Sequence, residues 1–331
     1  MKALVYTDIK ELTYREEQKP QLAKGEVLVR IDSVGICGSD LHAYLGHDER
    51  RISPLILGHE GAGTIVGGPK DGQKVVINPL VTCGQCPDCL AGRSNICAHR
   101  EIISMAPRQG AFAEYISIPE RNTVPVPDGM DMTKAALAEP IATGWHAVNV
   151  AAQKSHHPLA ECKALVFGGG AVGLSAALSL HAQGCKDIHL AETNDLRRKT
   201  VDAEGICTSF NPIDNNIVDE NSIDIVVDCV GGNPTRKAAS AAIKPGGVIV
   251  HVGLMDSADG LDIRKITLQE VTFCGTYTYT MKDFQAVVSA MHSGALGSLN
   301  WYEERPLSEG AQAFEDLLNH RSSSSKIVLR P

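Results

Sequence analysis

The segment between residues 163 and 192 constrains the fold more than any other part of the chain. Its apolar run at 163–167 predicts a buried strand, GGGAVG at 168–173 predicts a tight loop, and residues 174–183 have helical character. Strand, G-x-G-x-x-G and helix in this order begin a dinucleotide-binding βαβ unit, in which the glycines permit the turn, the approach of a pyrophosphate and close helix packing. The cofactor-binding candidates in the loop are Gly168, Gly170, Val172 and Gly173.

An acidic residue follows the next predicted strand. The apolar segment at 187–191 ends at Glu192, at the spacing expected for an acid that accepts hydrogen bonds from ribose hydroxyls. Its charge would repel the 2′-phosphate of NADP, so the sequence favours NAD. Arg197 and Arg198 leave the alternative open, because they could approach a 2′-phosphate or stack on the adenine.

Strands and helices continue to alternate beyond this point. Apolar segments at 223–227, 248–252 and 271–275 predict further strands. Near-continuous apolar strands that alternate with helices indicate an α/β fold with a doubly wound parallel sheet. Because ligands of such sheets lie at the carboxyl ends of the strands, we expect Gly253 and Thr276 near the nicotinamide ring.

The first third of the chain has a different pattern. Short alternating segments, separated by glycine and proline, predict a β-rich domain of the barrel or sandwich type. A helix at 284–292 and a strand at 326–329 are too short for a domain of their own, so we expect them to return to the β-rich domain. The predicted boundaries are 1–140 for the β-rich domain, 141–277 for the dinucleotide domain and 278–331 for the return.

Four cysteines lie close together in the β-rich domain, with the spacing C-x2-C-x2-C-x7-C. Four thiolates on one short loop can complete a tetrahedral shell around a single zinc ion, and such a closed shell is structural. Disulfides are the alternative, but the other cysteines are scattered singly through apolar segments, which is typical of a reducing compartment. The predicted ligands are Cys83, Cys86, Cys89 and Cys97.

A second group of candidate ligands lies in GICGSDLH and GHE. Cys37 and His59 offer a thiolate and an imidazole, and a catalytic zinc takes three protein ligands and leaves one position open. The third ligand is Glu60, next to the histidine, or Glu139, which lies in an apolar segment that predicts one helix over 133–152. A buried carboxylate needs a partner, and a metal ion would satisfy it.

The composition limits the partners. The 331 residues carry a net charge of −8 and include 43% hydrophobic residues, which describes a globular protein that does not attract nucleic acid or an anionic membrane. The sequence has no apolar run of membrane-spanning length, and its N-terminus lacks a signal-peptide core. We expect a cytoplasmic protein that acts on a small molecule.

With these residues in hand, the chain resembles the zinc-dependent medium-chain dehydrogenases and reductases, the group of alcohol, sorbitol, L-threonine and L-idonate dehydrogenases. GICGSDLH, LGHEGAG, CGQCPDC, AFAEY, AEP, FGGGAVG, DCVGG and KPGG occur in the family's order along the chain. The resemblance implies a GroES-like catalytic domain, an inserted Rossmann domain and an active site in the cleft between them. It also implies one catalytic and one structural zinc, Glu60 as a ligand, Glu139 on or near the metal, and a homodimer or homotetramer.

The resemblance implies a reaction as well. A secondary alcohol of the polyol or sugar-acid kind would transfer hydride to NAD, while zinc lowers the pKa of its hydroxyl. Ser39 would accept the proton and pass it, through the nicotinamide ribose, to His42 at the solvent, unless Ser39 only caps a helix and His42 is only a solvated helix residue. Polyol dehydrogenases often have arginine where this chain has Thr278, so L-threonine and simple alcohols are alternative substrates. A module that senses NAD without catalysis is the non-enzyme alternative.

Overall fold

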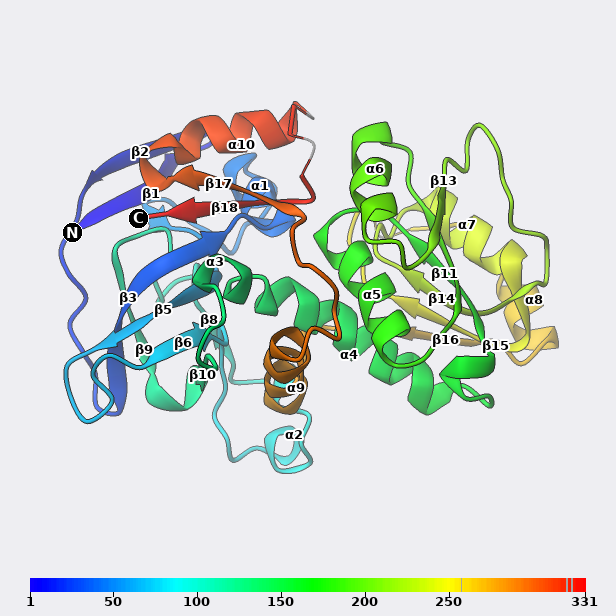
Figure 1. The fold of residues 1–331 in the computed structure, drawn as a ribbon, viewed down its shortest axis with the longest axis horizontal. Coiled ribbons are helices and arrows are strands. Elements are labelled where there is room, and N and C mark those ends of the chain that lie inside the picture. The colour runs from blue at the N-terminus through cyan, green and yellow to red at the C-terminus, as the bar shows by residue number, and fades with distance from the viewer. Residues whose placement is uncertain (257, 320, 323) are drawn as a thin grey trace. The chain divides into compact units, whose positions relative to one another are not determined.

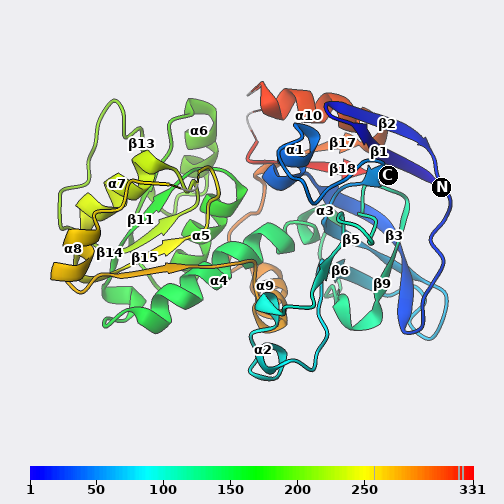
Figure 2. The ribbon, with the colours of Figure 1, turned by 180° about the vertical axis from the view of Figure 1, so that it is seen from behind.

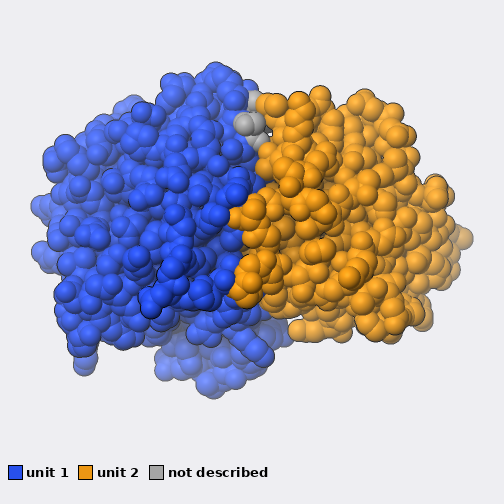
Figure 3. All heavy atoms as spheres, in the orientation of Figure 1, with its two compact units in different colours: residues 1–139, 280–292, 299–331 blue, residues 140–279, 293–298 orange. Residues whose placement is uncertain are grey.

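The chain forms two compact units in the computed structural model (Figure 3). The structure describes residues 1–256, 258–319, 321–322 and 324–331. Unit 1 comprises residues 1–139, 280–292 and 299–331, and unit 2 comprises residues 140–279 and 293–298.

Residues 293–298 join unit 2, although the sequence predicts the whole of 278–331 in the returning segment. Leu296 is fully buried, and Ser298 Oγ donates to Glu204 Oε1 at 3.1 Å. The chain therefore leaves unit 1 a second time, and the buried apolar side chain and the hydrogen bond to Glu204 help to hold this short loop on unit 2. The glycine-rich sequence of the loop contains no signal for this.

Unit 1 consists mainly of strands (Figures 1 and 2). Its strands are β1 (Lys2–Asp8), β2 (Glu11–Glu16), β3 (Glu26–Gly35), β4 (Leu55–Ile56), β5 (Glu60–Val66), β6 (Lys74–Ile77), β7 (Leu80–Val81), β8 (Glu101–Ile102), β9 (Tyr115–Pro119), β10 (Thr123–Pro125), β17 (Tyr302–Pro306) and β18 (Lys326–Arg330). Its helices are α1 (Gly38–Tyr44), α2 (Pro87–Leu90), α3 (Met132–Ala135), α9 (Met281–His292) and α10 (Gly310–Leu318). The largest sheet has the order β10-β6-β5-β3-β18-β17, with β9 also paired to β3. This confirms the β-rich domain.

Strand β3 positions the candidate metal site of unit 1, because it lies between β5 and β18. Gly35, its last residue, pairs with Glu60 of β5 on one side and with Val328 of β18 on the other. The strands are anchored by apolar side chains, of which Val34 and Leu329 are fully buried in the core. Three segments that are far apart in the sequence therefore meet at Gly35.

Unit 2 contains a six-stranded sheet in which every strand pair is parallel. Its strands are β11 (Lys163–Phe167), β12 (Asp187–Ala191), β13 (Thr208–Phe210), β14 (Ile223–Asp228), β15 (Ile243–His251) and β16 (Thr272–Gly275), and its helices are α4 (Ala138–Lys154), α5 (Ala171–Ala182), α6 (Asp195–Ala203), α7 (Asn233–Ala242) and α8 (Ile263–Leu268). The order is β13-β12-β11-β14-β15-β16, and both ribbon views show the sheet between α5 on one face and α7 with α8 on the other (Figures 1 and 2). The predicted doubly wound sheet is confirmed.

The single helix predicted over 133–152 is wrong, since two helices, α3 and α4, occupy this segment. The side chain of Asp131 caps α3 by accepting from the backbone N–H groups of Thr133 and Lys134. Pro140 lies in the first turn of α4, where its missing N–H leaves no helical hydrogen bond unmade. No helix in the described part of the chain has both the length and the apolar character needed to cross a membrane.

Candidate functional site

The loop before α1 contains the first candidate metal ligand. Cys37 occupies the N-cap of this helix, and its backbone N–H donates to Asp40 Oδ2 at 2.9 Å. The other carboxylate oxygen, Oδ1, accepts from Gly58 N at 3.3 Å. Asp40 is fully buried, so its carboxylate joins the loop of Cys37 to the loop that precedes His59. This explains why the two motifs come together.

Asp40 also orients His59. Its Oδ1 lies 3.4 Å from Nδ1 of the imidazole, and both side chains are buried. Burial alone would lower the pKa of His59, but the Asp40 carboxylate and Cys37 raise that pKa well above its ordinary value. Burial opposes ionisation of Asp40, yet His59 and Arg51 leave the pKa of this carboxyl lowered. A carboxylate behind a histidine is the arrangement that orients ligand imidazoles in metal sites.

Glu60 completes a group of three donors. One donor atom from each of Cys37, His59 and Glu60 lies within 4.8 Å of the other two. The Oε1 atom of Glu60 accepts from Lys326 Nζ at 2.6 Å, whereas its buried Oε2 has no hydrogen-bond partner among the described residues. An orphaned buried oxygen is costly, and a cation would satisfy it. Glu139, buried at the start of α4, lies outside this group, so the geometry favours Glu60 as the third ligand.

These donors suit zinc. A thiolate, an imidazole and a carboxylate are the side chains that bind this metal, and a site with three protein ligands leaves a fourth position for water or substrate. The group at Cys37, His59 and Glu60 therefore has the composition of a catalytic zinc site rather than a structural one.

Two further candidates lie on α1. Ser39 is half-buried and His42 is exposed, one helical turn further on, with its ring 6.3 Å from that of His47. Arg51 is buried and donates to Ser39 O at 2.8 Å and to Ser104 O at 3.1 Å, which fixes the start of the helix. Sequence reasoning missed Arg51, because the second of two consecutive arginines in a polar loop gives no signal of burial.

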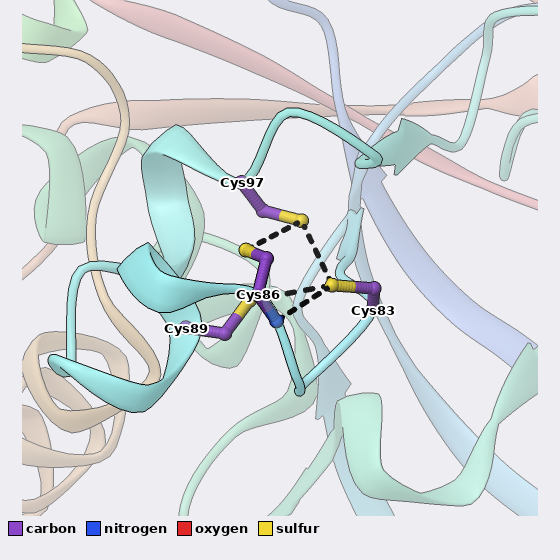
Figure 4. Close-up of side chains that lie close together, drawn as sticks. All are labelled: Cys83, Cys86, Cys89 and Cys97. Atoms are coloured by element: carbon purple, nitrogen blue, oxygen red, sulfur yellow. Dashed lines mark hydrogen bonds between the residues drawn. The ribbon is translucent and has the colours of Figure 1, made fainter.

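The four-cysteine loop forms a separate group, in which the sulfur atoms face one another (Figure 4). The Sγ atom of Cys97 lies 3.5 Å from that of Cys83 and 3.8 Å from that of Cys86, and Cys89 Sγ lies 3.9 Å from Cys83 Sγ. All four are free thiols. Backbone N–H groups of Gln85 and Cys86 lower the pKa of Cys83 to about 6, which favours the thiolate that binds metal. Burial raises the pKa of Cys89 to about 11, so the four thiols differ, but four sulfur donors at these distances have the composition of a closed structural zinc shell.

In unit 2 the backbone of the glycine loop leaves room for a ligand. Gly168 has a φ of +97°, which glycine adopts readily, and a Cβ at Gly173 would overlap the carbonyl oxygen of Gly168. Apart from its two chain neighbours, no described residue has an atom within 4 Å of a Cβ built at Gly170, the N-cap of α5. This helix has no side-chain cap, and Val172 lies in its first turn. The N-terminus of α5 is therefore suited to bind phosphate.

Glu192 contacts this loop from the end of β12. Its Oε2 accepts from Gly169 N and its Oε1 from Asn194 N, each at 2.7 Å. Carboxylate oxygens have further lone pairs, so both remain able to accept from ribose hydroxyls. The guanidinium group of Arg198 donates to the backbone oxygen of Glu192 at 2.8 Å, which fixes its position. Arg197 is half-buried in the first turn of α6.

Gly253 and Thr276 follow the carboxyl ends of β15 and β16. Gly253 N donates to Asp228 O at 2.9 Å, and Thr276 N donates to His251 O at 3.0 Å. The Oγ1 atom of Thr276 is buried without a hydrogen-bond partner among the described residues. Both residues therefore lie at the edge of the sheet where parallel folds bind ligands.

Comparisons with known proteins agree with this geometry. The alcohol dehydrogenase GroES-like domain matches residues 23–128, and the zinc-binding dehydrogenase domain matches residues 171–293. The chain is 32% identical to L-galactonate-5-dehydrogenase of Escherichia coli strain K12, over 99% of this chain and 98% of that protein. It is 29% identical to sorbitol dehydrogenase of Bacillus subtilis, over 100% and 97%. A solved Escherichia coli oxidoreductase/dehydrogenase of unknown specificity has a TM-score of 0.90 at 27% identity, over 99% and 98%.

The chain belongs to the family of zinc-dependent medium-chain alcohol dehydrogenases. It is an oxidoreductase that combines a GroES-like domain with a dinucleotide-binding domain, and zinc and NAD are the cofactors typical of this family. The fold class and enzyme class predicted from the sequence are thereby confirmed.

Proposed function

We propose that this enzyme oxidises a secondary alcohol of the polyol or sugar-acid class and transfers the hydride to NAD. The observation that carries the proposal is the grouping of Cys37, His59 and Glu60, whose donor atoms lie within 4.8 Å of one another. Three buried or half-buried donors with one orphaned oxygen provide the ligands of a metal site with an open position. A structural zinc would not need that position.

Each residue near this group has a distinct role in the proposal. A zinc ion held by Cys37, His59 and Glu60 supplies Lewis-acid activation of the substrate hydroxyl. Ser39 accepts the hydroxyl proton and passes its own proton to the nicotinamide ribose, from which His42, exposed on the same helix, takes the proton to solvent. The hydroxyl oxygen loses a proton, and the carbon that bears this oxygen loses a hydride, which together convert the secondary alcohol to a ketone.

Two side chains support these groups. Arg51 fixes the position of Ser39 by donating a hydrogen bond to the backbone carbonyl of Ser39. We assign Glu139, which is buried in the first turn of α4, a place beside the metal as the alternative carboxylate ligand.

The residues of unit 2 bind the dinucleotide in this proposal. The glycine loop and the N-terminus of α5 bind the pyrophosphate, the carboxylate at the end of β12 binds the ribose, and the residues after β15 and β16 contact the nicotinamide. Arg197 of α6 approaches the adenine end of the dinucleotide. These residues are Gly168, Gly170, Val172, Gly173, Glu192, Arg197, Gly253 and Thr276.

Two relatives support the substrate class. One is named for L-galactonate and the other for sorbitol, and both compounds carry several hydroxyl groups. Thr278 stands where polyol dehydrogenases often have arginine, so recognition of the remaining hydroxyls differs from that arrangement. L-Threonine and simple alcohols are therefore included in the test.

We further propose that the enzyme is cytoplasmic and forms a homodimer or homotetramer. The net charge of −8 and the free thiols support the first statement, and the family resemblance supports the second. Light scattering of the purified protein tests the assembly.

The experiment measures NADH formation with a panel of sugar acids, polyols, L-threonine and simple alcohols, using protein loaded with zinc. We expect turnover of at least one sugar acid or polyol, its loss after a chelator removes the exchangeable zinc, and its return when zinc is added. His59→Ala should abolish turnover. Cys207→Ser should not, because Cys207 belongs neither to the four-cysteine group nor to the group of Cys37, His59 and Glu60. Zinc-loaded, NADH-binding protein that turns over no compound in the panel would refute the proposed substrate class.

A further inference from the structure

A buried lysine contacts the candidate metal group. Lys326, the first residue of β18, is 3% exposed, and its Nζ donates to Glu60 Oε1 at 2.6 Å and to Ile36 O at 2.9 Å. Lysine is almost never buried unless it is paired. Both partners of Nζ are acceptors, and one of them is a carboxylate, so the side chain is held here as an ammonium cation.

The ion pair crosses an intervening strand. Glu60 belongs to β5 and Lys326 to β18, and β3 lies between them. Gly35 of β3 pairs with Glu60 on one side and with Val328 on the other. A Cβ at Gly35 would overlap Glu60 Oε2 and lie 3.2 Å from Lys326 Cδ. The missing side chain at this position therefore leaves the space in which the carboxylate and the ammonium group meet.

We propose that Lys326 is a positioning residue that sets the charge of the metal centre, an inference that rests on the proposed function of Cys37, His59 and Glu60. By holding Oε1, the ammonium group leaves Oε2 of Glu60 for the metal. It also offsets one of the two negative charges that the thiolate of Cys37 and the carboxylate of Glu60 bring to the group.

The charge of Lys326 has a consequence for the open position. A divalent cation bound by a thiolate and a carboxylate is neutralised by them, and the nearby ammonium group makes the potential at the open position more positive than it would be without Lys326. In a buried site this charge is weakly screened, so it favours an anion over a neutral molecule at the open position. The ionised form of an alcohol is such an anion.

The test separates this charge from the hydrogen bond. Lys326→Gln keeps a donor for Glu60 Oε1 without the charge, and Lys326→Arg keeps both. Lys74→Gln removes the same charge from an exposed position in β6 of the same sheet, and is the matched control. The full-length protein carries cobalt(II) in place of the exchangeable zinc, and sodium thiocyanate is titrated at constant ionic strength while the visible absorption of cobalt is followed.

We expect Lys326→Gln to bind thiocyanate at least about tenfold more weakly than the wild type, equivalent to about 1.4 kcal/mol. Lys326→Arg and Lys74→Gln should bind it with wild-type affinity. Unchanged affinity in cobalt-loaded Lys326→Gln would overturn the proposal. Loss of the exchangeable cobalt from this variant would overturn it too, because removing a nearby positive charge should tighten the binding of a cation.

Two other outcomes are also informative. If Lys326→Gln does not fold, Lys326→Met removes the charge instead: unchanged affinity for thiocyanate refutes the proposal, and a tenfold loss alongside wild-type affinity in Lys326→Arg supports it. If the wild-type chain binds metal only at the four cysteines, the proposed function of Cys37, His59 and Glu60 fails. The metal content is measured before the titration, so this failure is distinguished from failure of the role of Lys326.

Discussion

Gly35 is the residue at which a single methyl group should disrupt the candidate catalytic site. A Cβ there would overlap Glu60 Oε2, and both are fully enclosed by protein. Overpacking of this kind costs about 1–3 kcal/mol, and here the displaced atom is a candidate ligand. We expect Gly35→Ala to retain the metal of the four-cysteine loop and to lose the exchangeable metal, as measured by elemental analysis after dialysis.

Gly38→Ala is the matched control for this substitution. Gly38 begins α1, close to the same ligands in sequence, and a Cβ there meets no atom of the described residues within 4 Å beyond its chain neighbours and its own helix backbone. It should keep both metals. Full metal content and a wild-type melting temperature in Gly35→Ala would show that Glu60 is not held as described.

Glu192 allows a test of dinucleotide preference at the scale of one side chain. Hydrogen bonds to a charged group contribute about 1.5–3 kcal/mol, so Glu192→Ala should weaken NADH binding by roughly tenfold or more. NADPH should lose less, because the same change removes repulsion of its 2′-phosphate. Fluorescence titration measures both affinities, with Asp195→Ala, an exposed acid nearby, as the control. Equal losses of affinity for NADH and NADPH would show that Glu192 only stabilises the glycine loop through its hydrogen bond with Gly169 N.

The candidate ligands could be predicted from the sequence, but the residues that hold them could not. Cys37 and His59 belong to short motifs of recognisable composition. Asp40, Arg51 and Lys326 are charged residues, which are normally exposed, and their burial depends on partners brought by other strands and loops. For the same reason the residues alone left Glu60 and Glu139 as alternatives, and the pairing of β5 with β3 favours Glu60.

Among the elements, the four-cysteine loop should bind its metal independently of the other site. Its ligands lie on one short segment around α2 and share no residue with the group at Cys37. We expect Cys89→Ser to lose this metal and to lower the melting temperature, while the exchangeable cobalt spectrum persists. Elemental analysis and cobalt absorption measure the two sites separately. Cys274→Ser, outside both groups, is the control, and loss of both metals from Cys89→Ser would contradict their independence.

Elements with a strong sequence pattern were predicted and short ones were not. Strands β11 and β14 contain the apolar runs 164–167 and 225–227, all of whose residues are buried, which is the pattern of a parallel sheet. Strand β13 has only three residues and no apolar run, so nothing in its sequence indicates pairing with β12. The division of 133–152 into α3 and α4 escaped prediction, because the small apolar residues between them suit a helix equally well.

At the scale of the whole molecule, the chain completes its first unit with its last residues. Strand β18 lies inside the largest sheet of unit 1, between β3 and β17, and its central side chains are fully buried. Each such side chain contributes about 1.5–3 kcal/mol, so together they approach the whole stability of an ordinary domain, about 5–15 kcal/mol. Unit 1 should therefore not reach its final structure until the C-terminus is present. The central residues are Ile327, Val328 and Leu329.

A truncation tests this dependence. Removing residues 326–331 deletes β18 and Lys326 together, and leaves β3 and β17 with unpaired edges. We expect the shortened chain to lose the exchangeable metal and the cooperative unfolding of unit 1, followed by elemental analysis and calorimetry. Removing only the exposed Pro331 should change neither. A chain without residues 326–331 that still binds both metals would show that β3 and β5 alone hold Glu60, and that the last strand adds stability without shaping the site.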